Sequence, residues 1–165
     1  MSSSIRVCDA VGSDLEFLAR GNEAMALETE HRTLDAGTVR RGVATALHDD
    51  AHGRYFVAED ESGTAVGQLM VTYEWSDWRN GQFWWIQSVY VVPAARRHGV
   101  FKAMYRHVEG LARATAGVCG LRLYVESNNA TAQRTYTRCG MHDAHYRVME
   151  VELTGAHLAP LPKEN

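Results

Sequence analysis

The chain has 165 residues, of which 45% are hydrophobic and 22% charged, and its formal net charge is −3 at pH 7. This length suits one globular domain that buries a core without disulfides or metals. The small negative charge argues against nucleic acid or an anionic membrane as a partner, and three separated cysteines without a CxxC pair argue against a zinc ribbon or a disulfide scaffold.

The first half of the chain alternates between helical and extended patterns. A short strand from Ile5 precedes a helix from Asp14 to about Glu30 and a second helix over 38–47, which Asp35 or Thr38 caps. Three strands follow over 54–60, 65–75 and 83–92, and the hairpin loop 76–81 turns at Asn80-Gly81.

Helical periodicity returns after Pro93. Apolar side chains at 101, 104, 108 and 111 predict a helix from Gly99. A strand over 120–127, a helix from Asn128 or Asn129 to Cys139 and a last strand over 141–153 follow. This order predicts a single α+β domain over residues 1–153, with a mixed central sheet flanked by helices, and a loose tail over 154–165.

The turn between the strand over 83–92 and the helix from Gly99 has the composition of an anion-binding site. Backbone N–H groups at a helix N-terminus favour an anion, and Gly99 allows a diphosphate to approach the backbone closely. Positive or titratable side chains surround it, namely Arg96, Arg97, His98 and Lys102. An ordinary strand-to-helix turn with a solvated basic patch explains the same residues, and neither a Walker loop nor a GxGxxG fingerprint is present.

The segment RRHGVF resembles the Arg/Gln-x-x-Gly-x-Gly/Ala motif of the GNAT family of N-acetyltransferases, with Phe101 where Gly or Ala is usual. The resemblance covers Ile5 to Leu153. It implies that the turn Arg96–Lys102, with the backbone of Val100 and Phe101, binds the pyrophosphate of acetyl-CoA. It also implies that backbone N–H groups at Val89, Tyr90 and Val91 bind the thioester carbonyl and stabilise its oxyanion.

The segment NNATAQRTYTRCGM is similar to a second signature of this family, Asn-x-x-Ala-x-x-Leu-Tyr-x-x-x-Gly-Phe. Asn129, Ala132, Tyr136 and Gly140 match it. The resemblance implies that Asn129 and Ala132 contact the cofactor arm. It further implies that Tyr136 is a general acid, since a phenol donates a proton to a departing thiolate in contact with it. The alternative for Tyr136 is ordinary core packing.

The acceptor side is less determined by the sequence. Glu28 is the candidate base, and Glu28, Glu30, Glu74 and Trp85 are candidates for contact with the acceptor. A solvated surface charge is the competing interpretation of each carboxylate, Asp77 included. Four tryptophans gather around the hairpin, at positions 75, 78, 84 and 85, and they suit an acceptor pocket, the core or a dimer surface equally.

The resemblance implies an enzyme that transfers acetyl from acetyl-CoA to a primary amine of a small molecule, by direct attack in a ternary complex, and we expect it to be cytoplasmic. A protein or peptide amine as acceptor and a non-catalytic acyl-CoA sensor remain alternatives. We expect no metal, because no HExxH or similar spacing exists, and no membrane span, because the apolar stretches are too short. A homodimer is also compatible with the sequence, because a dimer surface is one of the interpretations of the four tryptophans.

Overall fold

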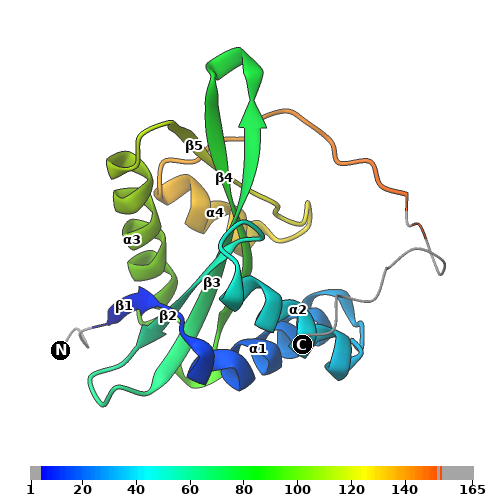
Figure 1. The fold of residues 1–165 in the computed structure, drawn as a ribbon, viewed down its shortest axis with the longest axis vertical. Helices are drawn as coiled ribbons and strands as arrows, with labels where there is room; N and C mark the ends of the chain where they lie inside the picture. Colours follow the sequence, from blue (N-terminus) through cyan, green and yellow to red (C-terminus); the bar gives the residue numbers. More distant parts are fainter. Residues whose placement is uncertain (1–4, 152, 154–165) are drawn as a thin grey trace, which may run out of the picture.

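Five strands form one sheet with helices on both faces (Figure 1) in the computed structural model, which describes residues 5–151 and 153. The strands are β1 Arg6–Asp9, β2 Arg54–Glu59, β3 Ala65–Ser76, β4 Gly81–Val91 and β5 Val118–Leu123. The helices are α1 Leu15–Glu30, α2 Ala36–His48, α3 Val100–Ala114 and α4 Ala130–Arg138. Short 3₁₀ turns lie at Gly12–Asp14, Asp77–Arg79 and Pro93–Ala95.

The strands lie in sequence order across the sheet. β1 to β4 are antiparallel neighbours, and β5 is parallel to β4. A parallel neighbour requires a crossover, which α3 supplies between β4 and β5. The mixed sheet confirms the predicted α+β fold.

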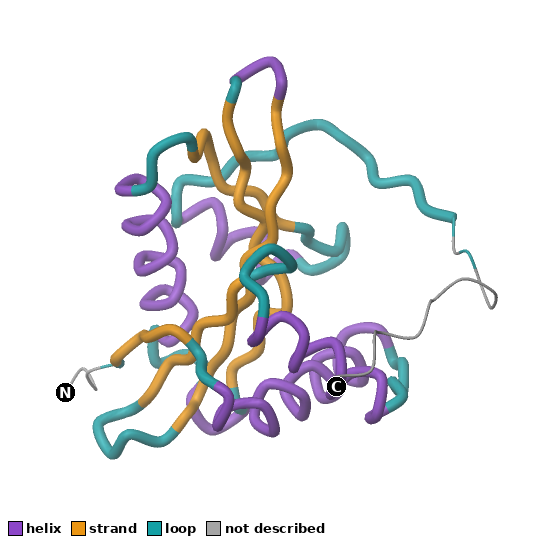
Figure 2. The backbone as a smooth tube through the Cα atoms, viewed as in Figure 1, coloured by secondary structure: helices purple, strands orange, loops and turns teal. Residues whose placement is uncertain are grey.

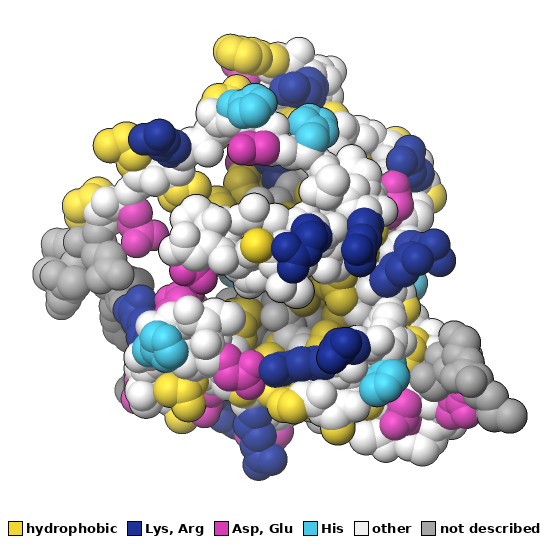
Figure 3. All heavy atoms as spheres, turned by 180° about the vertical axis from the view of Figure 1, so that it is seen from behind, with side chains coloured by type: hydrophobic (Ala, Val, Ile, Leu, Met, Phe, Trp, Pro, Cys, Tyr) yellow, Lys and Arg dark blue, Asp and Glu magenta, His cyan; other side chains and the backbone are white. Residues whose placement is uncertain are grey.

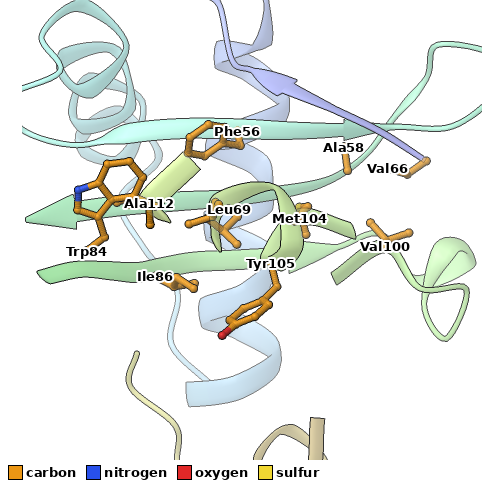
Figure 4. Packing of buried hydrophobic residues seen from close by; sticks show 12 residues of the cluster. Phe56, Ala58, Val66, Leu69, Trp84, Ile86, Val100, Met104, Tyr105 and Ala112 are labelled. Carbon is orange, nitrogen blue, oxygen red and sulfur yellow. The ribbon is translucent and has the colours of Figure 1, made fainter. Parts of the chain in front are cut away.

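Two hydrophobic cores lie on opposite faces of the sheet. Met104 and Val108 of α3 are fully buried against Leu69 of β3 and Ile86 of β4 (Figure 4). On the other face, Leu18 of α1 and Val43 of α2 pack with Tyr55 and Val57 of β2. The alternation of side chains along β2 supplies both cores, as expected for a central strand.

The helix caps settle two choices that the sequence left open. Asp35 accepts a hydrogen bond from the Thr38 N–H at 2.8 Å and caps α2. Asn129 accepts one from the Ala132 N–H at 3.0 Å and caps α4. Asp14 does not cap α1 with its side chain, because its carboxylate accepts from the Val11 N–H instead.

The predicted last strand over 141–153 is wrong for its described residues. Residues 141–151 and 153 form no strand, and Figure 2 shows the chain after α4 as a loop that leads away from the body. The side chains of Val148, Met149 and Val151 are 67%, 94% and 79% exposed, so this segment packs no apolar face against the body. A strand also needs the N–H and C=O groups of a neighbour, and this segment pairs with none in the part of the chain that the structure describes. The predicted tail over 154–165 lies outside the described residues.

No helix among the described residues is long and apolar enough to cross a membrane.

Candidate active site

The sheet opens where β4 passes β5. Pairing between these two strands ends at Ile86 and Leu123, although β4 continues for five more residues to Val91. Ser88 has a φ of 49°, and the register of β4 against β3 shifts between Gln68 and Met70. No described residue of β5 pairs with β4 beyond this point, and we call the unpaired region between the two strands the wedge.

Val89, Tyr90 and Val91 lie directly after this bulge and are half-buried. Val89 and Val91 pack against the α3 core, so their side chains serve the interior. Any contact that they make with a ligand in the wedge therefore falls to their backbone groups. The sequence predicted that these three residues lie on the strand. It did not predict that pairing with β5 ends beside them.

The turn from β4 into α3 presents a helix N-terminus beside the wedge. Gly99 has a φ of 84° and stands directly before α3, and a Cβ built there meets no atom within 4 Å. The N–H groups of Val100, Phe101 and Lys102 belong to the first turn of α3, where no helical carbonyl accepts them. The turn therefore combines open space, free donors and the positive end of a helix dipole. These features fit a diphosphate.

Arg96 connects this turn to the end of β4 and to α1. Its Nε donates to the Val91 carbonyl at 2.9 Å, and its Nη2 donates to Glu28 Oε2 at 2.7 Å. The guanidinium also lies 5.5 Å from the centre of the Tyr90 ring. Glu28 thus lies at the end of β4, paired with an arginine of the predicted cofactor turn, and this geometry favours a role in holding Arg96.

Positive side chains gather on the face that carries α3 and α4. Figure 3 shows groups of Lys and Arg on this face, with a hollow between them where hydrophobic side chains are visible. Exposed basic residues there include Arg97 and Lys102 near the turn and Arg134 and Arg138 on α4. A hollow of about 410 Å³ along α4 is lined in part by Arg134 and Arg138. Such a surface attracts an anionic ligand.

Tyr136 and Phe101 connect α4 to α3. Their ring centres are 5.4 Å apart in an edge-to-face arrangement, and Phe101 also lies 6.1 Å from Tyr105. The Phe101 ring packs against the α3 core, as its place in the helical apolar pattern predicts, so it leaves the turn open. Burial raises the pKa of the Tyr136 phenol, and neighbouring Cys139 adds to this effect. The phenol is therefore protonated at neutral pH and able to donate.

Asn129 and Ala132 lie one turn apart at the start of α4. The Asn129 side-chain oxygen is used by the cap on Ala132, which leaves its amide N–H group for other partners. The cap thus fixes where this amide points.

A polar and aromatic cluster lies on the sheet surface formed by β3, β4 and β5. Glu74 accepts from Trp85 Nε1 at 2.7 Å and from Arg122 Nη1 at 2.5 Å. Trp85 stacks on Tyr124 with ring centres 4.3 Å apart, and Arg122 lies 3.7 Å from the centre of the Phe83 ring. We call these five residues the Glu74 cluster. The structure brings together Glu74 and Trp85 as sequence analysis suggested, whereas Glu30 lies exposed at the end of α1.

Sequence analysis missed Arg122, Phe83 and Tyr124 as members of this cluster. Alternation along β4 places Phe83 and Trp85 on the same face of the sheet. Trp85 meets Arg122 only through the parallel pairing of β4 with β5, and Tyr124 directly follows β5. The four tryptophans separate in the fold: Trp84 is buried in the core, Trp85 belongs to the cluster, and Trp75 and Trp78 are 62% and 86% exposed on the projecting hairpin.

No group of three or more His, Cys, Asp or Glu side chains suited to a metal ion occurs among the described residues.

A family model and one solved structure of more than 30% identity show the family of this chain. A family model described as "Acetyltransferase (GNAT) family" matches residues 22–141. The structure of a "possible acetyltransferase" from Clostridium difficile 630 is 38% identical, with a TM-score of 0.84, covering 92% of this chain and 99% of that one. A comparison with curated proteins finds no match.

More distant structures share the fold. A GCN5-related N-acetyltransferase from Ralstonia eutropha JMP134 is 21% identical, with a TM-score of 0.71, covering 90% of this chain and 99% of that one. The aminoglycoside N-acetyltransferase AAC(6')-Iy, crystallised with CoA, is 15% identical, with a TM-score of 0.72, covering 93% of this chain and 98% of that one.

Proposed function

The chain belongs to the acetyltransferase (GNAT) family, and from this we propose that it transfers an acetyl group from acetyl-CoA to a primary amine of a small molecule. The proposal rests above all on one observation. A helix N-terminus with a left-handed glycine at position 99 and free N–H groups lies beside a wedge between two parallel strands. A long ligand with a diphosphate at one end and a slender arm fits that combination. A distant structural neighbour crystallised with CoA supports this ligand class.

Acetyl-CoA supplies the acetyl group as a thioester, whose carbonyl carbon is open to attack by an amine. The N–H groups of Val100, Phe101 and Lys102 bind the pyrophosphate, and Arg97, His98 and Lys102 add positive charge at the rim. Backbone N–H groups of Val89 to Val91 bind the thioester oxygen and stabilise the charge that develops on it. Asn129 and Ala132 at the start of α4 orient the arm.

Tyr136 protonates the leaving thiolate in this proposal. Amide formation breaks the C–S bond, and the sulfur takes the electron pair and then a proton. The raised pKa keeps the phenol protonated through the neutral range, and the contact with Phe101 limits the directions in which the ring can point. Phe101, which differs from the family motif, therefore helps to orient the proposed acid Tyr136.

The Glu74 cluster is the proposed acceptor surface. Its members Trp85 and Arg122 are paired on β4 and β5 one residue before pairing ends. Glu74 of β3 and the stacked Tyr124, which directly follows β5, both contact Trp85. Aromatic faces and a carboxylate together attract an ammonium group. Glu28 and Glu74 each pair with an arginine, so either one must part from its guanidinium before it takes a proton from the amine. The aromatic neighbours of Glu74 favour acceptor binding for that residue. Glu28 stays the predicted base to be tested, although its ion pair favours a role in holding Arg96.

A protein or peptide amine is a second candidate acceptor, and the openness of this surface favours it. Tyr124 is 57% exposed at the edge of the cluster, although Phe83 is buried. An open surface admits an extended chain, whereas a closed pocket selects a small molecule.

Thiol release from acetyl-CoA tests the proposal. The purified protein is assayed with aminosugars, aromatic alkylamines, polyamines and amino acids, and in parallel with peptides that carry a free N-terminus or lysine. We expect release above the acceptor-free rate with at least one small amine, and an acetylated product by mass spectrometry. Release with peptides alone would replace the small-molecule proposal by the second candidate. Binding of acetyl-CoA without release with any amine would support the sensor alternative.

A further inference from the structure

Gln68 of β3 is a polar side chain in the interior of the molecule. It is 0% exposed and stands among the largest fully buried side chains. Its backbone faces Tyr90 across the β3–β4 ladder, and its side chain points toward α1. An amide in this place is costly unless its hydrogen bonds are made.

The two hydrogens of the Gln68 amide are shared among three acceptors. Nε2 lies 2.8 Å from Asn22 Oδ1, 3.2 Å from the Leu18 carbonyl and 3.5 Å from the Ser88 carbonyl. Oε1 has no hydrogen-bond partner among the described residues. A Cβ at Gly21 would lie only 2.1 Å from that oxygen, so α1 has a glycine where the amide inserts.

The stability of this arrangement is mixed. Nε2 donates to buried or half-buried acceptors on α1, whereas the buried Oε1 has no hydrogen-bond partner among the described residues, which costs free energy. The fold therefore retains a buried amide of which one polar atom is unpaired. Buried polar groups of this kind either specify the arrangement of their neighbours or serve a site.

The contact with Ser88 indicates which neighbour is specified. Ser88 has a left-handed φ of 49° at the bulge in β4, and a non-glycine residue holds such a conformation only where its surroundings impose it. Asn22, which accepts from Gln68, donates to the Tyr55 hydroxyl at 3.0 Å. A chain of polar contacts thus runs from β2 through α1 and Gln68 to the bulge.

We propose that Gln68 is a positioning residue for acetyl transfer: its buried amide holds the Ser88 bulge against α1 and so aims the N–H groups of the following β4 residues at the thioester oxygen. This inference rests on the proposed function. Gln68 itself touches no reacting atom and acts through the backbone of β4.

Gln68→Leu tests the inference, with Tyr55→Phe as the matched control. Both variants remove polar atoms from the same buried chain, but only the first removes the contact with Ser88. We expect Gln68→Leu to lower kcat about 10-fold while the Kd for CoA, which has no thioester, changes less than 3-fold. Hydrogen exchange of the amides of Ser88 to Val91, measured without ligand, should become faster. Tyr55→Phe should leave kcat and this exchange close to wild type.

The outcomes are distinguishable from failure of the proposed function. Wild-type kcat in Gln68→Leu overturns the positioning role, whether or not exchange becomes faster. An equal loss of kcat in Tyr55→Phe also overturns it, because the effect would then follow from general weakening. Failure of the wild-type protein to bind or use acetyl-CoA would instead refute the proposed function. If Gln68→Leu does not fold, Gln68→Met, which is unbranched and of similar volume, takes its place.

Discussion

Replacing Gly99 by glutamate puts a carboxylate where the diphosphate is proposed to bind. A Cβ at this position meets nothing within 4 Å, so the side chain fits without displacing the fold. The φ of 84° is strained for any residue with a Cβ, and the expected loss of folding stability is about 1–2 kcal/mol. For a chain of this size, that corresponds to a fall in Tm of roughly 2–8 °C.

The effect on binding should be larger than the effect on folding. At about 5 Å, one pair of like charges costs roughly 1 kcal/mol in bulk water and about 3 kcal/mol at an effective dielectric constant near 20. The turn is exposed, so we take about 3 kcal/mol for repulsion by both phosphates together. This raises the Kd for acetyl-CoA about 100-fold, and the loss should shrink as salt is added, because screening weakens repulsion between exposed charges.

Calorimetric titration with acetyl-CoA measures this Kd, and two further variants separate its causes. Gly99→Gln has the same shape and strain without the charge. Gly63→Glu adds the same charge at a glycine with a φ of 79° and open space, in the turn between β2 and β3. We expect Gly63→Glu to bind like wild type and Gly99→Gln to bind more tightly than Gly99→Glu. Wild-type binding by Gly99→Glu would show that this turn does not hold the diphosphate.

Other predictions concern the acid and its neighbours. Tyr136→Phe should lower kcat by about 10²–10⁴-fold with little change in Kd for acetyl-CoA, because the hydroxyl acts when the thiolate leaves. Steady-state rates and calorimetric titration measure the two quantities. An unchanged kcat, with the chemical step rate-limiting, would show that Tyr136 only packs in the core. Wild-type kcat should fall as pH rises through the raised pKa of Tyr136, above its usual value of about 10, since only the protonated phenol donates, and Tyr136→Phe should lack this fall. Phe101→Ala should cost about 2 kcal/mol of stability through the lost ring contacts, seen by calorimetry as a lower Tm; an unchanged Tm would show that the contact is not maintained. If Glu28 only holds Arg96, then Glu28→Gln and Arg96→Gln should both raise KM for acetyl-CoA and spare kcat, whereas a large loss of kcat in Glu28→Gln alone would identify it as the base.

The turn before α3, where we propose that the cofactor binds, could be predicted from the sequence because its signals are local. Pro93, the basic residues and Gly99 stand within a few positions of the helix that they precede, so the turn and its open helix N-terminus follow from backbone preferences. Asn129 as a cap and the apolar spacing of α3 are local in the same sense. The order of strands and helices, and with it the α+β class, follows from hydrophobic periodicity.

Contacts between distant segments required the assembled fold. The ion pair of Glu28 with Arg96, the meeting of Glu74 with Arg122 and the insertion of Gln68 beside Gly21 join residues that are 68, 48 and 47 positions apart in the chain. Periodicity predicts which face of a strand a side chain occupies. Its neighbours on that face depend on the strand register and on which helix covers the face. The last predicted strand failed for the same reason: the pattern over 141–153 supplies extended residues, and only a partner edge makes a strand of them.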